Sequence, residues 1–165
     1  MAGFFRNFLT VLLALLSYGT VEVNARIRSV FFVTLFDTGL SKLKSDKYFQ
    51  LVEAAQYDFL IKNALIKTLL SKGYSFVNAS QIVKFYLPIR IFKKIHIDSE
   101  IIFWDDKWAY FCHLFFVNET VCAKVLVKMK FKQGRLTINP HQLLGLCPSS
   151  KPAYLSQWDS ALESL

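Results

Sequence analysis

The segment Lys107–Val117 is apolar on both faces of a β-strand, and this feature constrains the fold more than any other. Side chains along a strand point alternately to opposite faces. The residues of both alternating sets are largely apolar: Trp108, Tyr110, Cys112, Leu114 and Phe116 on one face, and Ala109, Phe111, His113, Phe115 and Val117 on the other. Because each face needs an apolar cover, we expect this strand to be central in a sheet that is covered on both sides.

One long helix precedes a series of strands along the chain. Apolar residues recur at helical spacing over Asp46–Asn63, and a second, short helix is expected at Ala64–Ser71, ended by Gly73. The β-prone segments predict strands at Arg26–Phe36, Tyr74–Leu87, Ile95–Trp104, Lys107–Val117, Thr120–Lys132 and Leu136–Ile138. A single helix covers only one face of such a sheet, so we expect the sheet to curl around it.

The chain is expected to form one folded domain at residues 26–165, after an apolar segment at residues 1–25. A length of 165 residues is typical of a single domain, and no linker divides the sequence. Proline residues from Pro140 onward predict an irregular C-terminal tail before a last helix at Tyr154–Leu165.

The apolar stretch Phe8–Leu16 is too short to span a bilayer as a helix. Three interpretations stay open for residues 1–16: a helix packed on the domain, a membrane-surface anchor, or a cleaved signal peptide that ends near Val23–Ala25. The three cysteines fit no disulfide framework and no redox motif, which favours a reducing compartment. We therefore expect a cytoplasmic protein, with membrane association and a signal peptide as the alternatives.

The net charge of +8 predicts an anionic partner, such as a phosphorylated cofactor or an acidic membrane surface. The charges are scattered, and no helix-turn-helix, zinc-finger or RNP pattern is present, so nucleic acid is disfavoured. His and Cys residues do not follow metal-ligand spacing, and we expect no metal. The 16 phenylalanines exceed what a plain core needs, which predicts an apolar pocket, an oligomer interface or a membrane contact.

The predicted hairpin at residues 102–127 carries a family resemblance. Its turn Trp104–Lys107, the Tyr and Phe residues that follow, and the Cys122–Ala123 pair are similar to the 4-hydroxybenzoyl-CoA thioesterase-like superfamily. The most similar branch contains the mammalian thioesterase-superfamily-member proteins and their bacterial relatives, and the helix that opens with Tyr48 matches it too. The resemblance implies an α+β hotdog fold, in which a curved antiparallel sheet wraps a long central helix, here with an extra N-terminal apolar helix. It also implies a homodimer or a tetramer.

The family's site motif reads roughly T-D-x-D-x-x-x-H-M-N-N-x-x-Y, and this chain departs from it. With the final tyrosine aligned on Tyr48, the histidine position falls on Lys42 and the two asparagine positions fall on Lys44 and Ser45. A shift of one residue places Asp37 at the second acidic position. The resemblance therefore carries only Asp37 over as catalytic base or nucleophile. We also expect Thr38 and Gly39, which follow Asp37, and Tyr48 to bind substrate.

Each of these assignments has a structural alternative. Asp37 is also the type of residue that starts a turn in a loop. Glu53, the second candidate for the catalytic carboxylate, is also an ordinary helix residue able to pair with a lysine, and Asp58 is expected to face solvent. His113 is expected to be a core residue.

Lysines on the outer side of the strand Thr120–Lys132 match the phosphates of coenzyme A in charge. They are Lys124, Lys128 and Lys130, with Arg90, Lys93 and Lys94 expected nearby. The alternative is a solvated strand face that discourages edge pairing.

The sequence thus predicts an enzyme of lipid metabolism, an acyl-CoA thioesterase weakened by a degenerate site motif. It needs no cofactor beyond the coenzyme A of its substrate. Two alternatives stay open: a non-catalytic acyl- or lipid-binding protein, and a membrane-associated scaffold.

Overall fold

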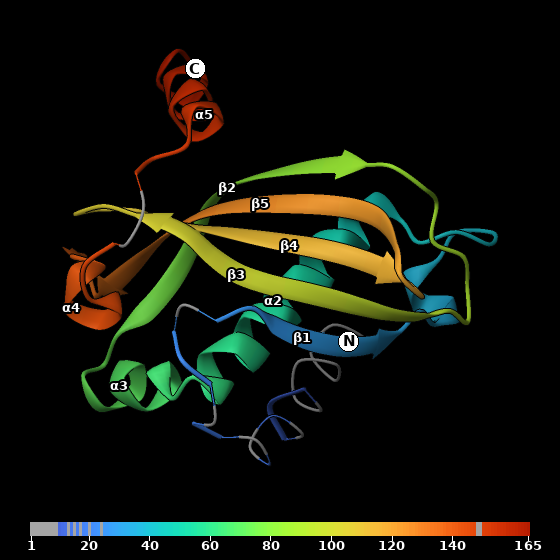
Figure 1. Cartoon of the computed structure of the whole chain (residues 1–165), viewed down its shortest axis with the longest axis horizontal. Helices are drawn as coiled ribbons and strands as arrows, with labels where there is room; N and C mark the ends of the chain where they lie inside the picture. Colours follow the sequence, from blue (N-terminus) through green and yellow to red (C-terminus); the bar gives the residue numbers. More distant parts are fainter. Residues whose placement is uncertain are drawn as a thin grey trace.

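A curved antiparallel sheet wraps around one long helix in the computed structural model of the chain (Figure 1). The structure describes residues 10–12, 14, 16, 18–19, 21–23, 25–147 and 150–165. Its elements, in chain order, are β1 (Ile27–Phe32), the 3-10 helix η2 (Leu35–Asp37), α2 (Ser45–Lys62), α3 (Leu65–Ser71), β2 (Ser75–Phe85), β3 (Lys94–Trp104), β4 (Ala109–Val117), β5 (Thr120–Gln133), β6 (Leu136–Ile138), α4 (His141–Leu144) and α5 (Ala153–Glu163).

The strand order is β1-β3-β4-β5-β2, and all neighbouring pairs are antiparallel. β6 folds back on the end of β5. Because β1 and β2 are the two edge strands, the connection between them crosses the whole sheet, and it lays α2 against one face (Figure 1). This is the predicted arrangement of one long helix wrapped by a curved antiparallel sheet, and the structure confirms it.

The main core lies between α2 and the inner face of the sheet. Phe59 of α2 packs edge-on against Phe111 of β4, with ring centroids 5.1 Å apart, and both side chains are buried. Ala54 and Ala55 are fully buried, and their small side chains let α2 approach the strands closely.

A second, smaller cluster covers part of the outer face of the sheet. Leu155 and Trp158 of α5 pack against Tyr110 of β4, which is fully buried. Strand β4 is thus covered by α2 on one face and by α5 on the other, as its doubly apolar pattern predicts. Further along the same strand, Leu114 and Phe116 are only half-buried.

β2 is three residues shorter than the sequence predicts. β1 and β4 are also shorter, and in both an aspartate binds the adjacent backbone. Asp105 accepts hydrogen bonds from two N–H groups in the segment expected to begin β4, so the strand starts at Ala109. The Asp37 carboxylate accepts a hydrogen bond from the Thr34 N–H, so the chain leaves β1 and turns into η2. The short helix α4 forms in a tail that was expected to be irregular before its last helix.

The N-terminal segment contacts the C-terminal end of α2 where it is described. Residues 10–12 and Ala14 are helical, and Ala14 is buried. The N–H of Val21 donates to the carbonyl of Lys62 at 3.1 Å. Most of the expected N-terminal helix lies outside the described residues, and the domain boundary after residue 25 stays a prediction. Among the described residues, no helix combines the length and the apolar character needed to cross a membrane.

Candidate active site

The loop 33–44 joins β1 to α2 and carries the predicted catalytic carboxylate, Asp37. The Asp37 side chain is 1% exposed, and its Oδ2 accepts hydrogen bonds from Thr34 N at 3.0 Å and from Thr34 Oγ1 at 2.7 Å. Its backbone carbonyl accepts a hydrogen bond from the N–H of Lys44, the N-cap of α2. Asp37 is therefore buried, oriented by a local turn and tied to the beginning of α2.

The beginning of α2, to which the Asp37 backbone is bound, offers hydrogen-bond donors. The first N–H groups of a helix have no acceptor inside the helix, and they carry a partial positive charge. The Lys44 side chain does not cap them. Such donors suit an anion or an oxyanion. The loop thus brings together a carboxylate and a helix N-terminus, which are the two components of the predicted site.

Thr38 and Gly39, predicted to bind substrate, both take part in the turns of this loop. Thr38 is 6% exposed, and its hydroxyl donates to the carbonyl of Leu35. The N–H of Gly39 donates to the carbonyl of Lys42 at 3.1 Å, which closes the second turn. These contacts give both residues a role in holding the loop in shape.

Tyr48, the third predicted substrate-binding residue, lies in the first turn of α2 and is 3% exposed. Its ring packs against Phe85 of β2 at 5.0 Å and against Phe115 of β4 at 5.1 Å. Burial raises the pKa of Tyr48 to about 12, so the phenol is neutral at physiological pH. The side chain fixes the N-terminus of α2 against the sheet.

The two other carboxylates of α2 lie away from Asp37. Glu53 is half-buried and lies eight residues past the first residue of α2, about 12 Å along the helix axis. Asp58 lies further along and is 5% exposed, so the expectation that it faces solvent is wrong. Its carboxylate accepts hydrogen bonds from Ser29 Oγ of β1 at 2.5 Å and from Lys62 Nζ at 2.7 Å. This helix face packs against β1, which the helical spacing alone does not reveal.

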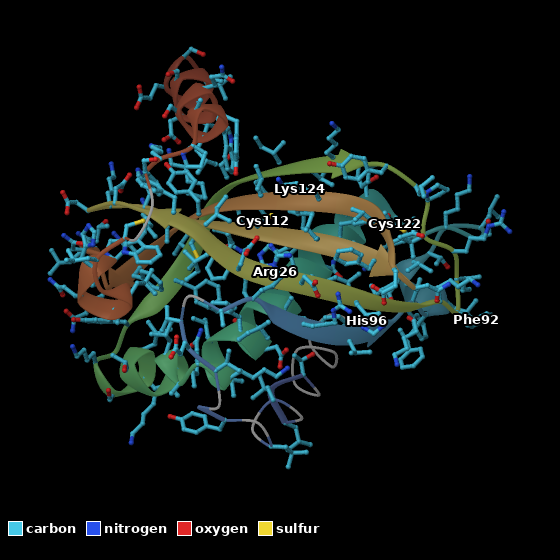
Figure 2. All side chains as sticks on the ribbon, in the orientation of Figure 1. Arg26, Phe92, His96, Cys112, Cys122 and Lys124 are labelled. Carbon is cyan, nitrogen blue, oxygen red and sulfur yellow. The ribbon has the colours of Figure 1, made fainter. Side chains whose placement is uncertain are left out.

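Lys124 and Lys130 lie on the outer face of β5, away from α2. Their ammonium groups lie over the rings of Tyr154 and Trp108, at 5.6 and 5.1 Å from the ring centroids. Figure 2 shows Lys124 on the sheet, away from the loop end of the molecule where Phe92 lies. These two lysines therefore lie on the face of the sheet opposite α2, whereas Asp37 lies in the loop that leads into α2.

Lys128 points to the same outer face but lies beneath α5. It is 7% exposed, and its ammonium donates to Asp159 Oδ1 at 2.6 Å. Asp159 also accepts hydrogen bonds from the Tyr110 hydroxyl and from Lys151. Of the three lysines assigned to phosphate binding, Lys128 is thus engaged in holding the C-terminal helix, a contact that the sequence pattern of β5 does not indicate.

His113 is buried on the inner face of the sheet, as expected of a core residue, but its polar partner Ser99 was not predicted. Ser99 Oγ of β3 lies 2.8 Å from Nδ1 of His113 on β4, and the His113 ring stacks on Phe111. Burial lowers the pKa of His113 to about 3, so the imidazole is neutral, and its Nε2 has no hydrogen-bond partner among the described residues. The signal for this pair was a polar residue at the inward position of each of two apolar strands.

Comparisons with known proteins agree with this architecture. The family model described as the thioesterase-like superfamily matches residues 40–140. A probable thioesterase of Saccharomyces cerevisiae is 31% identical over 128 residues, which cover 71% of this chain. The aligned part covers 56% of that protein, so this chain spans about half of its length.

Solved structures share the fold at low sequence identity. A probable thioesterase from Escherichia coli has a TM-score of 0.67 at 12% identity, and covers 72% of this chain and 96% of its own. A probable thioesterase from Bartonella henselae has a TM-score of 0.62 at 15% identity, and the match covers 70% of this chain and 98% of the Bartonella chain. The helix wrapped by the sheet, the strand order and the matched family model together show that the chain belongs to the thioesterase-like superfamily and has its hotdog fold.

Proposed function

We propose that the chain hydrolyses acyl-CoA thioesters, with Asp37 as the catalytic base. The observation that carries the proposal is a buried carboxylate in the loop that leads into α2, whose backbone carbonyl binds the N–H of the helix N-cap, in a chain of this family. Among the solved structures with this fold is a gentisyl-coenzyme A thioesterase, which supports a coenzyme A thioester as the substrate class. The positive net charge of this chain is compatible with the phosphates of such a substrate.

The reaction follows from these components. Asp37 accepts a proton from a water molecule as the water oxygen adds to the thioester carbonyl carbon. The N–H groups at the start of α2 stabilise the negative charge that forms on the carbonyl oxygen. The carbon–sulfur bond then breaks, the carboxylic acid is released, and the coenzyme A thiolate takes the proton from Asp37. Lys124 and Lys130 remain candidates for phosphate contacts, while Lys128 is bound to Asp159.

We expect this activity to be slow. Lys42, Lys44 and Ser45 stand where the family motif has its histidine and asparagines. Loss of one donor that holds a substrate carbonyl costs on the order of a hundredfold in rate. Binding depends on apolar and basic surfaces that remain, so acyl-CoA binding is expected to be retained better than turnover.

A non-catalytic acyl-CoA-binding protein is the second candidate, and a specific contact favours it. Oδ2 of Asp37 already accepts two hydrogen bonds from Thr34, which is the arrangement of a structural turn. The carboxylate then serves the loop, and the chain binds its ligand without cleaving it.

A panel of acyl-CoA substrates, assayed with the purified protein and with Asp37→Asn, separates the two candidates. The amide retains an oxygen that accepts the Thr34 hydrogen bonds, so the loop is preserved while the base is lost. We expect Asp37→Asn to abolish the residual hydrolysis and to leave the affinity for a non-hydrolysable acyl-CoA thioether unchanged. Equal rates for the parent and the variant exclude Asp37 as the base, and tight binding without turnover by the parent favours the binding protein.

We also propose a homodimer in which two sheets join along β2. β2 is an edge strand of 11 residues, and it exposes apolar side chains such as Val77 and Ile82. An open edge of this length offers backbone hydrogen bonds to a second strand. The opposite edge strand, β1, has only six residues.

A further inference from the structure

The end of β1 and the loops 33–44 and 86–93 lie at one end of the molecule (Figure 1), and these segments carry large, exposed apolar side chains. We define the apolar tip as the five exposed residues Phe32, Leu35, Phe36, Leu40 and Phe92. Phe36 is 77% exposed, Phe92 is 73% exposed and Leu40 is fully exposed. All of the tip except Leu40 lines an open hollow of about 330 Å³. A contiguous apolar patch of this kind marks an interaction site on a soluble domain.

The apolar tip is built on ordered backbone. The two loops are hydrogen-bonded to each other, with Leu43 N donating to Ile89 O at 2.8 Å and Ile91 N donating to Ser41 O at 3.0 Å. Phe92 has a φ of 61°, in the left-handed region that a bulky residue rarely adopts. Its N–H still donates to a carbonyl at the end of β1. The fold therefore maintains a strained aromatic residue on the surface, which is a feature of functional sites.

Five cations lie in or directly after the two loops that carry the apolar tip. Lys42, Lys44, Arg90, Lys93 and Lys94 are all exposed, and none forms an ion pair with a described residue. The two loops contain a single acidic residue, the buried Asp37.

Two of these cations face each other directly. Lys42 and Arg90 are partners in a β-bridge between the loops. Like charges directly opposite each other repel, and a bound anion relieves that repulsion. The surface around the tip is thus complementary to a negatively charged partner.

We propose that the apolar tip and its cations dock the protein onto an anionic lipid bilayer. Apolar side chains that enter the acyl region and cations that contact the headgroups are the two terms of interfacial binding. A soluble phosphate ligand satisfies the cations but leaves the exposed phenylalanines in water. A two-fold interface pairs a surface patch with the same patch on the second copy. A dimer formed through the apolar tip would therefore bring the cations of one copy against the same cations of the other, and like charges repel. The docking is independent of whether Asp37 catalyses hydrolysis.

Sedimentation of the full chain with vesicles tests this proposal. We expect binding to vesicles of phosphatidylcholine with phosphatidylserine and much weaker binding to phosphatidylcholine alone. Phe92→Asn removes the ring and places a residue that tolerates the left-handed conformation, so binding falls about tenfold without a lower thermal midpoint. The matched control is Leu70→Asn on α3, at the opposite end of the molecule, because Leu70 is also 73% exposed.

The charge reversals Lys42→Glu with Arg90→Glu provide the second test, and binding is expected to fall at least tenfold. Their control is Lys72→Glu with Arg135→Glu, which changes the net charge equally at the opposite end, where both residues are exposed. Parent-like binding by both tip variants overturns the proposal, as does equal binding to the two kinds of vesicle. If soluble coenzyme A displaces the protein from the vesicles, the cations form a coenzyme A site instead. If Phe92→Asn dissociates an oligomer, the apolar tip is an interface between copies.

Discussion

The ammonium group of Lys128 on β5 donates a hydrogen bond to the carboxylate of Asp159 on α5 at 2.6 Å. Both side chains are largely buried, with 9% and 14% exposed. This pair ties the C-terminal helix to the outer face of the sheet, beside the apolar contact of Trp158 with Tyr110. The C-terminal helix is thereby part of the folded domain.

Asp159→Asn is expected to destabilise the protein by about 2 kcal/mol, because it leaves the buried ammonium of Lys128 without its counter-charge. Burial raises the pKa of Asp159, but hydrogen bonds from Lys128, Lys151 and Tyr110 outweigh it and hold the pKa below its ordinary value of 3.8. This stabilisation is present above pH 3.8 and is lost as the pH falls through the lower pKa of the folded state. Urea unfolding at pH 7 and pH 3 measures both effects, and an equal loss of stability in the variant at the two pH values contradicts the charge-based explanation.

His113→Phe is expected to flatten the pH dependence of stability between pH 6.5 and pH 4. The neutral imidazole is buried, and its pKa is lowered from 6.5 to about 3. As the pH falls below 6.5, the unfolded chain gains a proton that the folded chain does not accept, so stability is lost, by about 2 kcal/mol at pH 5. Phenylalanine removes this titration. The free energy of unfolding of both proteins at pH 7 and pH 5 provides the measurement, and parallel pH profiles are the contrary result.

Asp58→Ala is expected to cost about 2 kcal/mol or more, because Ser29 and the part-buried Lys62 lose their acceptor. Glu53→Ala is the control on the same helix, and we expect a change of less than about 0.5 kcal/mol for this less buried residue. Chemical denaturation of both variants checks the difference. Similar values for the two variants mean that the Ser29–Asp58 contact is not a stabilising one.

Val77→Asp is expected to turn a homodimer into a monomer. Val77 lies on the β2 edge, and a charged side chain on an edge strand discourages the pairing of that edge with a second chain. Val30→Asp on β1 is a matched control, since Val30 and Val77 are 48% and 45% exposed. Light scattering at micromolar concentration gives the mass of each protein. A monomeric parent, or a dimer that survives Val77→Asp, argues against pairing through β2.

The order and type of the main elements were predictable because they depend on local patterns. The apolar spacing over Asp46–Asn63 gave α2 to within one residue at each end. The two apolar faces of Lys107–Val117 indicated a strand covered on both sides, which the structure shows for the first part of β4, where α5 packs on Tyr110. The boundaries were less predictable, since a single side-chain contact, such as Asp105 with the backbone before Ala109, decides where a strand begins.

The site was predictable only as a list of residues along the chain. The sequence by itself determined that a carboxylate, Asp37, precedes the long helix and that the motif's histidine and asparagines are absent. Only the tertiary structure decided which charges meet, because ion pairs and buried polar contacts join residues far apart in sequence. It paired Lys128 with Asp159, buried Asp58 against Ser29, and placed Lys42 opposite Arg90. These pairings arise from the curvature of the sheet and the packing of two helices on it, and no local pattern encodes them.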